Sequence, residues 1–144
     1  MENPTLTKTV FLAASRETVW SYLTEKDKLV QWFNPSDVPM EDNLTMGEEF
    51  AVFSDANDGT KLCWGSVLEM DPPSRLSYSF TVGPLNGAMT NVAWTLEEAH
   101  GGTVLTLEHE GIANAAGEAA FGLLSGIDAG WDRYLGALRG SFKD

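Results

Sequence analysis

Glu69, Tyr78 and His109 are the side chains best suited to exchange a proton with a bound molecule. A general acid or base must come within roughly 2.6 to 3.2 Å of the reacting atom, or reach it through one water. One hypothesis is therefore a cyclase- or hydratase-like enzyme that uses these groups as proton donor or acceptor. It requires at least two of the three to converge in one pocket.

Other catalytic chemistries find no support in the sequence. Cys63 is the only cysteine and lies within an expected strand, with no sign of a base beside it. His100 stands in a Gly-rich turn, and no G-x-S-x-G nucleophile motif accompanies it. No cluster of His, Cys and carboxylate residues has zinc spacing, and there is no phosphate-binding glycine motif. We therefore expect no metal and no cofactor, assign no catalytic residue, and favour a non-enzymatic function.

The charge balance excludes two classes of partner. Nine Lys and Arg residues face 21 Asp and Glu residues, which gives a formal net charge of -12. Nucleic acid and anionic membrane would both be repelled. No apolar run approaches the ~18 residues of a membrane span, and the polar start is not a signal peptide. With a single cysteine and hence no intrachain disulfide, the expected location is the cytoplasm.

The first third of the chain predicts one strand and two short helices. Residues 5–12 alternate apolar and polar side chains, the period of a half-buried strand. Ser15 is a suitable N-cap for a helix with one apolar face. Thr24 and Asp27 resemble a capping box that would begin the second helix, which Asn34-Pro35 ends.

From Gly47 to Gly111 the period changes to two, which predicts an antiparallel meander. Alternation places Glu108 and Glu110 on the face opposite His109, pointing outward. The side occupied by Glu69 stays open, because both alternating sets of its strand are mostly apolar and a bulge near Gly65 would decide between them. The expected strands are residues 49–54, 60–70, 75–82, 89–97 and 103–110.

The C-terminal part predicts a long helix with an apolar stripe. Apolar residues from Phe121 to Phe142, Trp131 among them, recur at spacings of three and four. Gly126 and Gly130 each weaken a helix interior by roughly 1 kcal/mol, so we expect the firm part from about Asp128 onward. The stripe should pack across the concave face of the twisted sheet, within a single domain spanning residues 1–144.

Five segments in order carry a resemblance to a known family: Val19–Thr24, Leu29–Phe33, Gly65–Leu76, Gly102–Leu107 and Gly130-Trp131. They are similar to the activator of heat-shock protein 90 ATPase homologues, a family of the START-like (SRPBCC) superfamily. The resemblance implies an α+β helix-grip fold. In that fold an antiparallel sheet of six to seven strands is wrapped around a long C-terminal helix, with two short helices after the first strand.

The resemblance also implies a cavity between the sheet and the last helix, which would bind a small hydrophobic or aromatic ligand, lipids included. The alternative is ordinary aromatic core packing, with His109 as a core histidine whose hydrogen bonds are made within the protein. Candidate lining residues are Trp32, Trp64, Tyr78, Phe80, Trp94, His109, Trp131 and Tyr134.

A third hypothesis is an interaction protein, either a homodimer or a minimal co-chaperone. The Gly- and Ala-rich residues 113–126, with Phe121, Leu123 and Leu124, form the candidate surface. Eukaryotic co-chaperones of the resembled family carry a separate N-terminal domain, whereas this chain begins at its first strand. We therefore expect self-association in preference to a chaperone partner.

Overall fold

The structure is a computed structural model that describes residues 6–29, 31–33, 43–53, 61–82, 90–111 and 120–142. Within these ranges the side chains of residues 52–53, 61–62, 82 and 120–125 are outside the description. The side chains of Phe121, Leu123 and Leu124, on which the expected dimer surface depends, therefore lie outside the described part of the chain.

The described residues form one antiparallel sheet in the strand order β1-β6-β5-β4-β3-β2. This confirms the expected meander, and β4 has the predicted limits while the other strands differ by one or two residues at an end. The strands are β1 (Leu6–Leu12), β2 (Glu49–Phe53), β3 (Lys61–Asp71), β4 (Arg75–Val82), β5 (Thr90–Ala99) and β6 (Gly102–Glu110).

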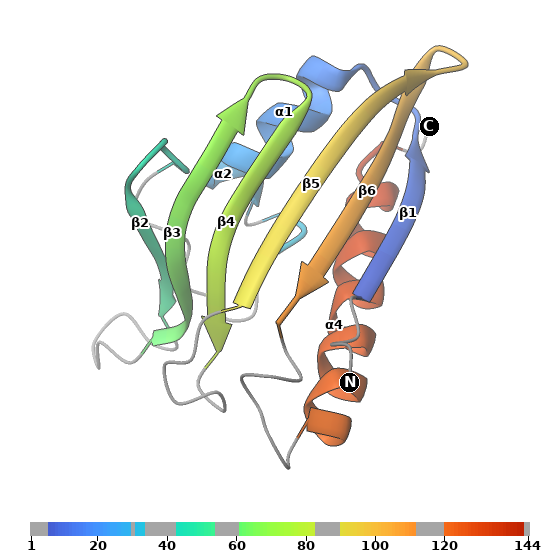
Figure 1. Ribbon diagram of the computed structural model, residues 1–144. Coiled ribbons are helices and arrows are strands. Elements are labelled where there is room, and N and C mark those ends of the chain that lie inside the picture. Colours follow the sequence, from blue (N-terminus) through green and yellow to red (C-terminus); the bar gives the residue numbers. More distant parts are fainter. Residues whose placement is uncertain are drawn as a thin grey trace.

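The helices α1 (Arg16–Thr24), α2 (Lys26–Leu29) and α4 (Ala120–Gly140) lie on one side of the sheet (Figure 1). Ser15 is the N-cap of α1, as predicted, and its side chain accepts a hydrogen bond from the Thr18 N–H at 3.2 Å. The predicted capping box at Thr24 is wrong. Thr24 is the last residue of α1, and its hydroxyl donates to the Trp20 carbonyl at 3.0 Å instead of capping α2.

The C-terminal helix begins at Ala120, eight residues before the position at which we expected its firm part. Gly126 and Gly130 lie inside it, with open space where a side chain would stand. Trp131, Leu135 and Leu138 are buried against the sheet, and such packing outweighs low intrinsic helix propensity.

A charged contact joins α4 to the edge strand β1. The Lys8 ammonium lies 2.5 Å from an Asp128 carboxylate oxygen and 2.9 Å from one of Asp132. The hydrogen bond to Asp128, with a further one to Asp132, raises the pKa of Lys8. The helix is thus held to the sheet by buried rings on one side and by this cluster at the sheet edge.

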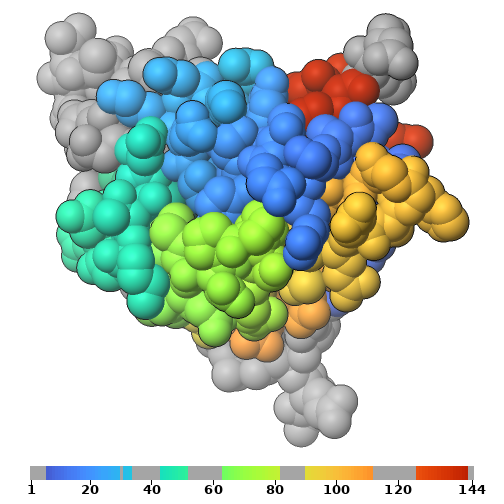
Figure 2. Space-filling view, turned by 90° about the horizontal axis from the view of Figure 1, so that it is seen from above, coloured from blue at the N-terminus to red at the C-terminus, as the bar shows by residue number. Residues whose placement is uncertain are grey.

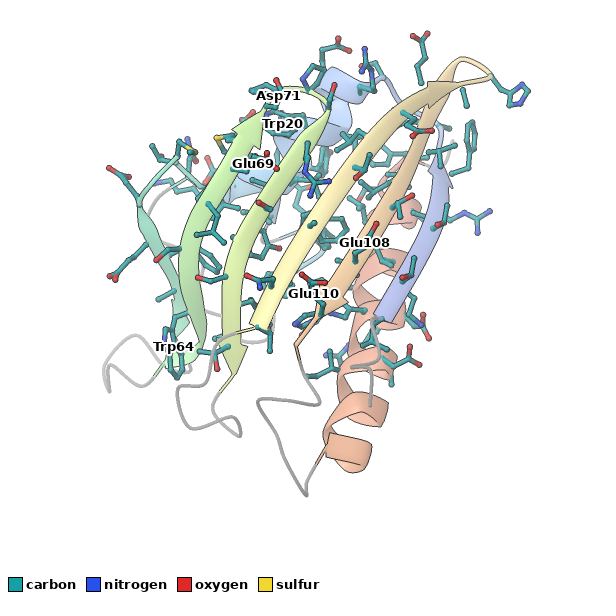
Figure 3. All side chains as sticks on the ribbon, viewed as in Figure 1. Trp20, Trp64, Glu69, Asp71, Glu108 and Glu110 are labelled. Atoms are coloured by element: carbon teal, nitrogen blue, oxygen red, sulfur yellow. The ribbon has the colours of Figure 1, made fainter. Side chains whose placement is uncertain are left out.

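The main hydrophobic core lies between the inner face of the sheet and the three helices. In the view from above, α1 and α2 cover the upper end of the molecule (Figure 2). The opposite, outer face of the sheet carries exposed carboxylates, among them Glu108 and Glu110, as alternation predicted (Figure 3). Among the described residues, the fully buried aliphatic side chains include Leu12, Val19, Leu23, Leu76, Val92, Leu96, Leu105, Leu107 and Leu138.

A bulge in β3 settles the question left open for Glu69. The β3–β4 register shifts between Val67 and Glu69, so that Val67 pairs with Tyr78 while Glu69 pairs with Ser77. Glu69 therefore points to the outer face, where its carboxylate lies 2.5 Å from the Nε atom of Arg75. One alternating set of β3 residues faces the interior before the bulge, and the other set faces it after the bulge.

Gly65 permits an unusually close approach of β3 and β4. A Cβ atom at this position would lie 1.8 Å from the Ser79 carbonyl oxygen. Beside it, the Ser66 N–H donates to the Ser79 hydroxyl at 2.9 Å instead of to a backbone carbonyl. A glycine inside a strand is typical of such a close backbone approach.

Candidate ligand-binding site

A cluster of contacting aromatic rings lies between the sheet and α4. Trp131 of α4 lies at its centre, with ring centroids 5.5 Å from Trp94 of β5 and 6.2 Å from Phe80 of β4. Trp32, which follows α2, contacts Trp94 edge-on at 6.0 Å. Seven of the eight predicted lining residues meet here: Trp32, Tyr78, Phe80, Trp94, His109, Trp131 and Tyr134.

Trp64 is the exception. It pairs with Thr81, and in β4 Thr81 alternates with Tyr78 and Phe80 across the sheet. Trp64 is therefore on the outer face, where it is half-buried near the lower end of β3 and away from α4 (Figure 3). It is not part of the aromatic cluster because Cys63 occupies the inner position of that strand.

His109 is completely buried, and both of its ring nitrogens are engaged. The Trp131 indole N–H donates to Nδ1 at 2.9 Å, and Nε2 lies 2.7 Å from the Thr90 hydroxyl oxygen. The Thr90 hydroxyl itself donates to the Phe80 carbonyl at 2.6 Å. Because the Thr90 hydroxyl proton lies in that hydrogen bond, the Nε2–H of His109 is the donor in the contact with the Thr90 oxygen.

These hydrogen bonds define a neutral imidazole. Burial lowers the pKa of His109 from 6.5 to about 4, because the charged form would lose its hydration. Protonation at Nδ1 would also displace the indole of Trp131. His109 therefore links β6, β5 and α4 and has no ring nitrogen left for a ligand.

Tyr78 and Trp94 form a second buried pair. The Trp94 indole N–H donates to the Tyr78 hydroxyl oxygen at 2.9 Å. Burial raises the pKa of Tyr78 above its ordinary value, and burial likewise raises that of the nearby Cys63 thiol to about 12. Both groups are uncharged at neutral pH, and Cys63 is not a reactive thiolate.

The three proton-exchanging candidates do not form one site. Glu69 is on the outer face, while Tyr78 and His109 are on the inner face, separated across the sheet by Val92 of β5. With both His109 nitrogens engaged, the geometry gives no support to a shared acid–base function for these groups.

Phe33 and Tyr134 are half-buried members of the cluster that contact Trp131, and Phe50 is another, which contacts Tyr78. The Phe33 ring stacks on Trp131 at 6.0 Å with an interplanar angle of 13°, and it contacts Tyr134 edge-on at 5.0 Å. Phe33 was not among the lining residues predicted from the sequence, and the short helix α2 ends before it, at Leu29. One aromatic residue after a four-residue helix has no periodic partner to reveal its direction.

The fold and this inner aromatic cluster define an α+β protein of the helix-grip class. The sequence matches the model of one family over residues 13–143, described as Activator of Hsp90 ATPase homolog 1-like protein. The chain belongs to this family, which confirms the resemblance found in its segments.

Solved structures with the same fold come from several organisms. CalU16 from Micromonospora echinospora is 26% identical with a TM-score of 0.74, over 98% of this chain and 76% of that one. The Aha1 dimer from Colwellia psychrerythraea is 17% identical with a TM-score of 0.74, over 96% of each chain. PFC0360w, an HSP90 activator from Plasmodium falciparum, is 19% identical with a TM-score of 0.74, over 91% of this chain and 90% of that one.

Comparison with curated proteins gave no match. Within the described ranges, no three His, Cys, Asp or Glu side chains come together as metal ligands. None of the described helices has the length and apolar character needed to cross a bilayer.

Proposed function

We propose that this protein binds a small apolar or aromatic molecule between the inner face of the sheet and α4. The observation that carries the proposal is the continuity of the aromatic cluster, which runs from half-buried Phe33 and Tyr134 through Trp131 to buried Phe80 and Trp94. Ligand sites are typically lined by apolar and aromatic side chains with few polar groups.

The hydrogen bonds of the cluster favour an apolar ligand body. The indoles of Trp32, Trp94 and Trp131 all donate to protein acceptors, to the Tyr22 carbonyl in the case of Trp32. Among the described residues, no buried side-chain nitrogen or oxygen lacks a hydrogen-bond partner. A polar ligand group at this depth would lose its hydration with little in return.

Native mass spectrometry of the purified protein, with thermal-shift screening against lipids and aromatic compounds, tests the proposal. We expect a co-purified or added apolar molecule to raise the melting temperature. Phe80→Trp should weaken binding by filling the interior, whereas Phe11→Trp, on an exposed ring, should leave binding unchanged. Absence of binding to any apolar compound, or equal effects of the two variants, would contradict it.

A second candidate function is self-association. It is favoured by the likeness in fold to the Aha1 dimer from Colwellia psychrerythraea over nearly the full length of both chains. Light scattering at micromolar concentration is expected to show a dimer that Phe121→Asp dissociates. A strict monomer that the substitution leaves unchanged would remove this candidate.

The family description and the HSP90 activator from Plasmodium falciparum favour a chaperone partner as the alternative binding function. Chaperone ATPase turnover measured with and without the added protein tests it. Unaltered turnover would leave self-association as the remaining interaction hypothesis.

A further inference from the structure

We infer that the ligand is an amphipathic acid, whose apolar body enters the aromatic cluster while its anionic group is held at the surface by Arg133 and Tyr134. This inference rests on the proposed function and assigns a chemical class to its ligand. It joins three observations: an interior without a charged side chain among the described residues, a half-buried aromatic pair, and an arginine that no described carboxylate pairs with.

The interior cannot hold the charged end of a ligand. His109 is neutral, with both nitrogens engaged by Thr90 and Trp131, and the Tyr78–Trp94 pair is uncharged. No Lys or Arg is found among the buried side chains of the described residues. An unpaired anion buried there would lose its hydration without compensation, so it must stay at the surface.

Phe33 and Tyr134 mark a place where the cluster reaches the surface beside α4. Both rings are half-buried, and both contact the buried ring of Trp131, at 6.0 and 6.4 Å between centroids. A ligand that separates these two rings gains contact with the Trp131 ring, which both of them touch. Planar ligands would be favoured, because Phe33 and Trp131 already stack nearly parallel.

Arg133 lies beside Tyr134 and is suited to bind an anion. Its guanidinium carbon is 4.9 Å from the centre of the Tyr134 ring, and Nη2 donates to the Tyr134 hydroxyl at 3.1 Å. The neighbouring Asp128 and Asp132 are engaged by Lys8. Within the described part of the chain, no carboxylate forms an ion pair with Arg133.

Arg16 and Arg139 likewise form no ion pair among the described residues, but only Arg133 lies over an aromatic ring of the cluster. Stacking on Tyr134 orients the guanidinium and leaves most of its five N–H donors available. A carboxylate or sulfonate held there could accept two parallel hydrogen bonds while its apolar part lies on Phe33 and Trp131. The apolar interior therefore selects the body of the ligand, and the cation at its edge selects an anionic group.

Two dyes that differ in one charged group provide the test. 1-Anilinonaphthalene-8-sulfonate carries a sulfonate, and N-phenyl-1-naphthylamine is the same aromatic body without it. We expect both to bind the wild-type chain, monitored by dye fluorescence, with the sulfonate bound more tightly. Arg133→Gln should weaken sulfonate binding about tenfold, as for loss of a charge-assisted hydrogen bond, and leave binding of the neutral dye unchanged.

Arg139→Gln is the matched control. Arg139 is exposed on the same helix and, among the described residues, has neither a carboxylate ion-pair partner nor a contact with a ring of the aromatic cluster. It should change neither affinity, and both variants should melt at the wild-type temperature. Equal weakening of the two dyes by Arg133→Gln, or no weakening, would overturn the inference. Failure of the neutral dye to bind the wild-type chain would overturn the proposed function, and the inference with it.

Discussion

His109 shows how a titratable residue becomes a structural one through its partners. An imidazole on the inner face of a sheet could serve a ligand, yet Thr90 and Trp131 occupy both of its nitrogens. The hydrogen bonds fix one neutral tautomer, and burial opposes its protonation. The residue therefore contributes to the pH dependence of stability instead of to proton transfer.

The sign of that dependence follows from the lowered pKa. The unfolded chain takes up a proton on this histidine below pH 6.5, whereas the folded chain resists protonation down to about 4. The neutral His109 contributes fully to the free energy of unfolding only above pH 6.5. This contribution falls as the pH falls, by about 2 kcal/mol between pH 7 and pH 5. Urea unfolding of wild-type and His109→Gln chains at both values isolates this contribution, since all other titrating groups are shared. Equal losses in the two chains would contradict the assignment.

At the scale of elements, the closeness of β3 and β4 at Gly65 shapes the sheet. Gly65→Ala would place a methyl group 1.8 Å from the Ser79 carbonyl oxygen, so the strands must separate. We expect a loss of about 1 to 3 kcal/mol or more in the free energy of unfolding, measured in urea. Gly136→Ala, in open space on α4, should instead stabilise the protein by up to about 1 kcal/mol. A neutral Gly65→Ala variant would show that the contact is not needed.

The docking of α4 depends on Trp131, which is 3% exposed and also donates to His109. Trp131→Ala removes a buried ring and leaves Nδ1 of His109 without its donor. We expect a loss of about 3 to 5 kcal/mol in a urea melt. Arg139→Ala, at an exposed position of the same helix, serves as the control and should change stability by less than about 0.5 kcal/mol. A loss below about 1 kcal/mol for Trp131→Ala would show that the ring is not core.

The periodicity of the sequence was sufficient to predict the strands and helices. It predicted only in part which way their side chains point and which groups they bind. The limits of β4 and the outward direction of Glu108 and Glu110 follow from alternation alone. Alternation fails in β3, because a bulge has no signature that distinguishes two mostly apolar sets. The capping-box pattern at Thr24 failed for a different reason: its hydroxyl bonds within the preceding helix.

The candidate site was predictable as a set of aromatic residues and not as a set of contacts. The engagement of His109 depends on β5 and α4, whose mutual position is not encoded in any local pattern. The same holds for Tyr134, the ring over which Arg133 lies, because its contact with Phe33 joins residues far apart in sequence.

At the scale of the whole molecule, the net charge of -12 affects stability. Exposed carboxylates on neighbouring strands, such as Glu97, Glu108 and Glu110, repel one another in the folded chain. Raising the salt concentration from about 10 mM to about 150 mM shortens the screening length from roughly 30 to 8 Å. We expect the melting temperature to rise by about 3 °C, measured by circular dichroism, which corresponds to about 1 kcal/mol. A fall in melting temperature would show that ion pairs such as Lys8 with Asp128 dominate instead.

The complete pairing of the described buried side-chain nitrogen and oxygen atoms has a consequence for how this protein can evolve. Phe80 contributes no side-chain hydrogen bond to the aromatic cluster, so a substitution that changes its size leaves the side-chain hydrogen bonds around it intact. The links from Trp131 to His109 and from Trp94 to Tyr78 can meanwhile keep the helix and strands in place. Selection can therefore resize the space between sheet and helix by exchanging one ring at a time, without first passing through a variant that no longer folds.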